Sequence, residues 1–249
     1  MNLQRLPLAI HTNVADLIDQ LRAAQIGEFG DGASFLRRER GGRPYWYVRT
    51  RQVRGERSER YLGPETPELL AAIGTAKTIN DAADGRRQIV RALRAAGLHT
   101  PDLRTGRILQ ALNKAGVFRL RAAVVGTVAF QTYGALLGFA LPAQAVRTGD
   151  LDIAQDYGIS MAIDDGLDRP FLEVLKAADP AFSPVPKLDP GKSATYRTPD
   201  GYMVDVLTTS RHAADEETSR LAALNTDATP LRFLDFLLRD TVEAVVLHE

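Results

Sequence analysis

Three aspartates in the second half of the chain offer the clearest chemistry. Asp150 and Asp152 lie in the run RTGDLDIA, where they alternate with Leu151 and Ile153. Because side chains two positions apart share one face of a strand, both carboxylates point away from the apolar side. Asp205 lies between Val204 and Val206, so it also alternates with apolar residues. Carboxylates gathered on one face repel one another unless a cation lies between them, and such hard oxygen ligands suit Mg²⁺ or Mn²⁺.

A glycine and a threonine supply the second part of this chemistry. The strand-like run FRLRAAVV meets Gly126 and Thr127 and continues directly into a helical pattern. A glycine at a strand-to-helix turn lets the backbone approach phosphate oxygens, and the helix N-terminus adds N–H donors and a positive dipole. Two divalent ions can activate an attacking hydroxyl and neutralise a triphosphate. The sequence therefore predicts a phosphate site beside a metal site.

Each piece also has a plain structural alternative. A DxD pair on a strand is commonly a solvated face, a Gly-Thr turn is commonly only a turn, and an aspartate between valines can be an ordinary outward residue. Function is favoured by the order of the pieces, which is strand, Gly-Thr, helix, strand with DxD, and a later strand with one aspartate.

In this order the pieces resemble the nucleotidyltransferase superfamily of DNA polymerase beta. More closely, VVGTVAFQTYGALLG, RTGDLDIA and DGYMVDVLTT look like a bacterial nucleotidyltransferase-like family. In that family the catalytic domain follows a segment of the type GRPYWYVRTRQVRGERSERYLGPETPEL, so the similarity runs from about residue 30 onward. The resemblance implies an α+β fold: a mixed-sheet core flanked by helices, with a small N-terminal β-hairpin and helical module.

The resemblance also implies a role for each residue. Gly126 and Thr127 would hold the triphosphate of an NTP. Asp150 and Asp152 would bind both metal ions, Mg²⁺ or Mn²⁺, and Asp205 would complete the metal site and assist the acceptor hydroxyl.

Three further features bear on this resemblance. RTGDLD is similar to the Arg-x-x-Asp-x-Asp pattern of abortive-infection toxin nucleotidyltransferases, which implies a phosphate contact for Arg147. The insert GFALPAQAV must loop out without displacing the DxD strand, and loop closure costs grow slowly with length. The chain ends at VEAVVLHE, expected to be a strand, where relatives continue into a further strand and a basic helical segment. We therefore expect a C-terminally incomplete catalytic domain, whose activity depends on that segment.

The stretch 31–65 is rich in arginine and aromatic residues. Basic side chains interleaved with aromatics suit a sugar-phosphate backbone and stacked bases, which favours RNA or DNA binding. The alternative is a small sheet with Tyr45 and Tyr47 on its packed face and arginines that keep its edges soluble. Both interpretations stay open. The residues assigned to nucleic-acid binding are Arg43, Trp46, Arg49, Arg51 and Arg54.

The remaining elements must position these residues. We expect an N-terminal helix (1–30) starting after a cap at Thr12, the β-module (31–65), a helical segment (66–104) broken near Gly85, and a catalytic domain (105–249). Within the catalytic domain, ISMAID is expected to be a strand, and the segments on either side of PDG are expected to form a hairpin. Residues 170–178 and LRFLDFLL are expected to be helices. Phe130 and Tyr133 are expected in the core. The remaining expectation concerns aspartates assigned to loops: Asp156, Asp164, Asp165 and Asp168.

Composition sets outer limits on function. The chain has 249 residues, 45% of them hydrophobic, which is enough for a sizeable core. Lys+Arg and Asp+Glu are both 31, so any preference for nucleic acid must be local. There is no cysteine, and the four histidines show no ligand spacing, which disfavours zinc. No uncharged stretch approaches the roughly 18 residues of a membrane span, so a cytoplasmic protein without membrane contact is expected.

Two functions are consistent with these features. The first is transfer of an NMP from an NTP to an acceptor hydroxyl with release of pyrophosphate, tRNA or another RNA being favoured over a protein side chain. The second is a catalytically inactive nucleic-acid-binding or regulatory protein on the same scaffold, with a protein partner in a toxin-antitoxin or phage-defence pair.

Overall fold

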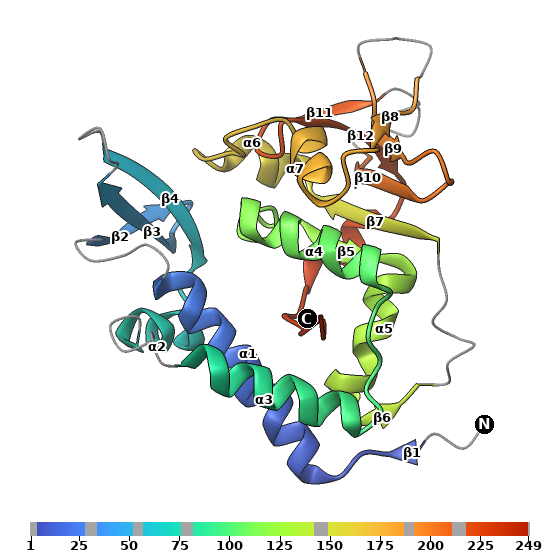
Figure 1. Cartoon of the computed structure of the whole chain (residues 1–249). Coiled ribbons are helices and arrows are strands. Elements are labelled where there is room, and N and C mark those ends of the chain that lie inside the picture. Colours follow the sequence, from blue (N-terminus) through green and yellow to red (C-terminus); the bar gives the residue numbers. More distant parts are fainter. Residues whose placement is uncertain are drawn as a thin grey trace.

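The computed structural model describes residues 4–27, 34–51, 57–75, 82–141, 149–186, 192–210 and 218–248. It has the α+β architecture that the sequence predicts (Figure 1). Its elements, in chain order, are β1 (Gln4–Arg5), α1 (Leu8–Gly27), β2 (Ser34–Arg40), β3 (Arg43–Arg51), β4 (Arg57–Pro64), α2 (Pro67–Thr75), α3 (Ala82–Ala95), α4 (Leu103–Ala115), β5 (Ala123–Val125), α5 (Gly126–Leu137), β6 (Phe139–Ala140), β7 (Asp150–Gln155), α6 (Tyr157–Ala162), α7 (Phe171–Ala178), β8 (Ser183–Pro184), β9 (Thr195–Arg197), β10 (Met203–Thr209), β11 (Ser219–Leu221), β12 (Thr226–Leu231) and α8 (Leu234–Arg239).

The largest sheet is mixed and has the strand order β11-β12-β10-β7-β5, with β9 pairing to β10 and β8 to β9. Strand β10 is parallel to both β7 and β12, whereas β5 is antiparallel to β7. One face is covered by α4 and α7, whose apolar side chains form the main core with Leu151, Ile153, Val204 and Val206. On the other face, α8 packs against Ala154. The main core therefore lies on one side of this sheet, and the aspartates of β7 share the other side with α8.

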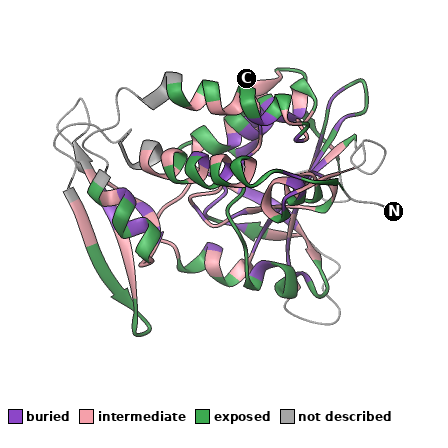
Figure 2. Ribbon diagram, turned by 90° about the horizontal axis from the view of Figure 1, so that it is seen from below, coloured by how far each residue is buried: buried purple, intermediate pink, exposed green. Residues whose placement is uncertain are grey.

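The N-terminal half forms two smaller units. Strands β2, β3 and β4 make an antiparallel sheet, here called the β-module, against which α2 packs (Figure 1). The tip of its β2–β3 hairpin is exposed (Figure 2). Helices α1 and α3 pack on each other and bury Leu17 and Leu93 together with Val245 and Leu247 of the C-terminal stretch.

Four sequence expectations about these elements are wrong. Helix α1 begins at Leu8, so Thr12 lies inside it and its hydroxyl donates to the Leu8 carbonyl instead of capping the helix. Gly85 lies within α3 rather than at a break. The first four residues of ISMAID belong to α6 and none to a strand, because the Asp156 carboxylate caps that helix by accepting the Ile159 N–H.

The fourth concerns the C-terminal stretch, where residues 241–248 form no strand. The alternation of VEAVVLHE is real, since Val245 and Leu247 are buried. Their partners are helices α1 and α3 rather than another strand, which periodicity alone does not reveal.

Candidate active site

Strands β7 and β10 bring the three aspartates together. In β7 the half-buried Asp150 and Asp152 alternate with the fully buried Leu151 and Ile153. The parallel register places Asp205 directly opposite Asp152. Neighbouring strands lie about 4.8 Å apart, so these two carboxylates start from adjacent backbones on one face. The shared face that the alternation predicts is therefore present.

Gly126 adjoins the same carboxylates. Strand β5 is antiparallel to β7 and sets Val125 opposite Asp152, so the chain turns into α5 beside that aspartate. Gly126 has a φ of +68°, and a Cβ at this position would lie 2.4 Å from Oδ2 of Asp152. A side chain here would meet both backbone strain and the carboxylate, which explains the glycine. Thr127 follows it in the first turn of α5 and is half-buried.

The electrostatics of the site couple the three carboxylates. Burial, together with the negative charges of Asp150 and Asp205, raises the pKa of Asp152. Asp205 is held by Thr195 on the neighbouring strand β9, whose hydroxyl donates to Oδ1 at 2.5 Å. The site thus concentrates negative charge on a sheet face, which a divalent cation would offset.

The fit of a metal ion can be tested on these donors. Among the described residues, the side chains of no group of three or more His, Cys, Asp or Glu residues are arranged so that they could hold a metal ion. Asp152 directs one oxygen to Gly126, and Asp205 directs one to Thr195. However, Mg²⁺ is usually held by one or two carboxylates together with substrate phosphates. The donor type and register of these aspartates fit that requirement.

The residues assigned to nucleic-acid binding do not form one free surface. The indole N–H of Trp46 donates to Glu65 at 2.9 Å, and Arg49 pairs with Glu59 at 2.6 Å. Tyr47 is buried and makes an edge contact with Tyr61, so the packed-sheet alternative accounts for this part of the module.

The other assigned arginines are Arg43, Arg51 and Arg54 of the nucleic-acid set and Arg147 of the phosphate site. Arg43 is exposed at the hairpin tip, with no ion pair to any described residue. Arg51 lies in β3, paired in register with Arg57. Arg54 and Arg147 lie outside the described residues.

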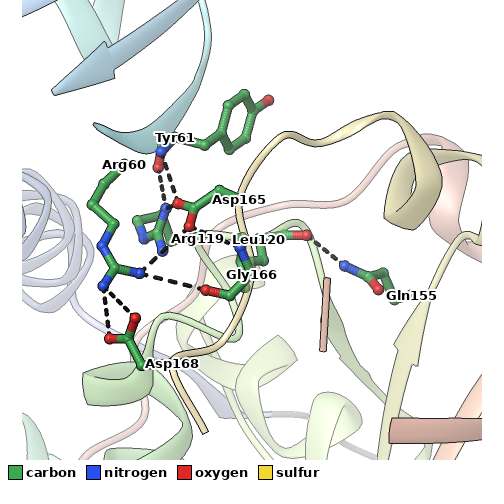
Figure 3. A network of polar contacts seen from close by, with 8 residues as sticks. All are labelled: Arg60, Tyr61, Arg119, Leu120, Gln155, Asp165, Gly166 and Asp168. Atoms are coloured by element: carbon green, nitrogen blue, oxygen red, sulfur yellow. Dashed lines mark hydrogen bonds and ion pairs between the residues drawn. The ribbon is translucent and has the colours of Figure 1, made fainter. Parts of the chain in front are cut away.

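Sequence reasoning missed a partly buried ion-pair network, which Figure 3 shows. Asp165, expected in a loop without a role, is 7% exposed and pairs with Arg119 at 2.5 Å and with Arg60 of β4 at 3.4 Å. It also accepts the backbone N–H of Tyr61, while Arg119 donates to the Tyr61 carbonyl. Asp168 pairs with Arg60 from outside. This network, here called the Asp165 network, joins the β-module to the loop between α6 and α7 and to the turn between α4 and β5.

Two further contacts could have been found from the sequence. A hairpin centred on PDG pairs positions symmetrically, so Thr195 falls opposite Asp205. The acidic run DDGLD contains Asp164, Asp165 and Asp168 and is opposite in charge to the arginine-rich stretch 31–65. This complementarity was the signal for the ion pairs between the two. Arg40 pairs with Asp164 and contacts the Ala162 carbonyl, which adds a second link to the Asp165 network.

The expectation that Phe130 and Tyr133 belong to the core is wrong. They are 39% and 45% exposed and make an edge contact with each other. Helix α5 instead buries Val128, and Gly134 lies against the Phe139 carbonyl. A helical repeat shows that residues share a face but not which face is covered.

A family model described as a nucleotidyltransferase matches residues 103–249, more than half of the chain. The chain belongs to this nucleotidyltransferase family. No curated protein and no solved structure matches it. The matched region begins at the first residue of α4 and includes Gly126, Thr127 and the three aspartates, whereas the β-module precedes it. No helix of the described residues of this nucleotidyltransferase is long and apolar enough to cross a membrane.

Proposed function

We propose that this nucleotidyltransferase moves an NMP from an NTP to an acceptor hydroxyl. The observation that carries the proposal is the juxtaposition of Asp152 with Gly126 at the start of α5, while Asp205 lies opposite Asp152 in register. A negatively charged sheet face beside a helix N-terminus can hold a cation and a triphosphate at once.

Each residue has a distinct part in this mechanism. Of Asp150, Asp152 and Asp205, one or two at a time together with the substrate phosphates would hold Mg²⁺ or Mn²⁺, which when bound neutralises the triphosphate and acidifies the acceptor hydroxyl. The backbone at Gly126 and the hydroxyl of Thr127 orient the phosphates.

The reaction is a substitution at the α-phosphorus. The acceptor oxygen bonds to this phosphorus, the bond to the β-phosphate oxygen breaks, and pyrophosphate leaves. Asp205, oriented by the Thr195 hydroxyl, is placed to take the proton that the acceptor loses.

For the acceptor we favour RNA. The β-module carries Arg43 exposed at its tip, and the Asp165 network attaches this module to the loop after α6 and the turn after α4, both in the region that the family model matches. An exposed arginine on a module attached to the catalytic region can contact a polyanionic acceptor. A protein side chain is the second acceptor to test.

The test is incubation of the purified chain with each α-labelled NTP, Mg²⁺ or Mn²⁺, and total RNA. Label is followed on RNA and on protein separately. Asp152→Asn should abolish labelling because it removes a negative charge that would hold the metal ion. Asp16→Asn, at an exposed position of α1, serves as the matched control and should leave labelling unchanged.

The outcomes separate the alternatives. Label on RNA that Asp152→Asn removes supports the proposal, and label on protein replaces RNA by a protein acceptor. Metal-dependent NTP binding without label under any condition would favour the inactive regulatory protein. Labelling that survives Asp152→Asn would refute the assignment of the site.

A further inference from the structure

Residues of four neighbouring strands form one row across the large sheet, on the face that carries the aspartates. Thr195 of β9 is paired in register with Asp205 of β10, which is itself paired with Asp152 of β7. Asp152 is paired in turn with Val125 of β5, the residue before Gly126. Directly opposite residues of neighbouring strands share one face of a sheet. The row therefore runs from a hydroxyl, across two carboxylates, to the turn that begins α5.

The Thr195 hydroxyl is directed at the carboxylate that takes the proton in the proposed reaction. It donates a hydrogen bond to Oδ1 of Asp205 at 2.5 Å, and Thr195 is only half-buried. A hydroxyl within hydrogen-bond reach of a carboxylate has the geometry of a nucleophile beside its general base. Thr208, farther along β10, instead donates to the Gln155 carbonyl. Thr195 thus combines a free-standing nucleophile type with a base already in contact.

The order of the row matches the order of the groups that react. Neighbouring strands lie about 4.8 Å apart, so the Thr195 backbone is about 5 Å from that of Asp205 and about 14 Å from that of Val125. In the proposed function the phosphates lie at Gly126 and Asp205 takes the proton, which puts the α-phosphorus at the Asp205 end. The Thr195 oxygen lies at that same end, where an acceptor hydroxyl is required.

We propose that this nucleotidyltransferase transfers an NMP to its own Thr195. The inference rests on the proposed function and names an acceptor within the chain. The Thr195 oxygen bonds to the α-phosphorus of the NTP, the bond to the β-phosphate oxygen breaks, pyrophosphate leaves, and Asp205 takes the hydroxyl proton. Because one chain holds both the hydroxyl and its base, no second molecule has to be oriented. The attached NMP then lies on Asp205, so each chain reacts once, and an RNA acceptor competes for the same position.

The first test is mass spectrometry of the purified chain after incubation with each NTP and Mg²⁺ or Mn²⁺, without RNA. We expect the addition of one NMP, located on Thr195 by fragmentation of the peptide that contains it. Thr195→Ser keeps a hydroxyl and should still gain one NMP at this position, whereas Thr195→Val, which is similar in shape, should gain none. Thr12→Val removes a hydroxyl from an exposed position of α1 and is the matched control, which should gain one NMP.

A second measurement establishes that the reaction occurs within one chain. The Asp152→Asn variant carries a purification tag, so that its mass differs, and is incubated with the unsubstituted chain and NTP. The variant should stay unmodified while the unsubstituted chain gains its NMP. The modified fraction at a fixed time should also not depend on the concentration of the chain.

Nucleotide binding provides a readout that is separate from transfer. An NTP analogue with a methylene group between the α- and β-phosphorus cannot release pyrophosphate, and its dissociation constant is measured by calorimetry with Mg²⁺. Thr195→Val should bind this analogue as tightly as the unsubstituted chain does. The absence of modification in this variant then reports loss of the acceptor and not loss of the nucleotide.

Three results overturn the proposal. One is an NMP located on a residue other than Thr195, and another is modification of the Asp152→Asn variant by the unsubstituted chain. The third is labelled RNA together with an unmodified chain, which would leave the proposed function intact and restrict Thr195 to orienting Asp205. If the chain neither binds the analogue nor modifies any acceptor, the proposed function itself fails.

Discussion

Replacement of Asp165 by asparagine should loosen the β-module from the rest of the chain. The change preserves shape but removes the negative charge that faces Arg119 and Arg60. Asparagine keeps one carbonyl oxygen, so it can still accept one hydrogen bond, but its amide group must then face donors such as the Tyr61 N–H. Arg119, whose side chain is 17% exposed, is left without its closest carboxylate.

The magnitude follows from burial. Breaking a buried ion pair from one side costs about 3–5 kcal/mol. Because Arg119 and Arg60 retain some contact with water and asparagine keeps one acceptor, we expect the lower end, about 3 kcal/mol. For a chain of this size that corresponds to a fall in melting temperature of roughly 6–12 °C.

The chain offers a matched control and a local probe. Asp168 pairs with the same Arg60 at 2.6 Å, but its side chain is 79% exposed, so Asp168→Asn should cost no more than about 1 kcal/mol. Trp46 is the only tryptophan and lies in the β-module, so its fluorescence reports that module, whereas circular dichroism reports all helices. In Asp165→Asn the fluorescence transition should occur at a lower temperature than the dichroism transition. Equal destabilisation by the two substitutions would refute this account of the Asp165 network.

Three further outcomes follow from the same structure. Gly126→Ala should abolish nucleotide binding and lower the free energy of unfolding by about 1–2 kcal/mol, since φ is +68° and the new Cβ would meet Asp152. Calorimetric titration measures the binding, and thermal unfolding measures the stability. Normal nucleotide binding by this variant would contradict the geometry. Gly106→Ala should destabilise the chain because its Cβ would lie 2.1 Å from Nδ1 of His248. Gly85→Ala, with open space around its Cβ, should stabilise the chain by about 0.5–1 kcal/mol. A gain in melting temperature for both variants would show that the His248 side chain moves aside at no cost. Arg49 lowers the pKa of Glu59 and Arg37 lowers the pKa of Glu65. The contribution of these two ion pairs to stability is therefore complete above the ordinary carboxyl pKa of about 4.3 and is lost as pH falls through the lowered values. Trp46 fluorescence measured against pH follows this loss of stability, and Glu65→Gln should make the loss smaller.

Local sequence alone determined much of the candidate site. Alternation in DLDIAQ places Asp150 and Asp152 on one face, because a strand has a period of two and its apolar positions must be buried. The glycine between a strand and a helix marks the turn at Gly126, and PDG marks the hairpin that leads to Asp205. These features depend only on neighbouring residues, so they can be read without knowledge of the fold.

Contacts between distant segments were decided by the tertiary structure. The parallel register of β7 and β10 sets Asp205 opposite Asp152, although more than fifty positions separate them. Packing of α5 through Val128 left Phe130 exposed, against expectation. Asp165 gained its role only when β4 came to lie beside it. Periodicity fixes which side chains share a face, but the element that covers each face depends on the global packing of the chain, which no local pattern encodes.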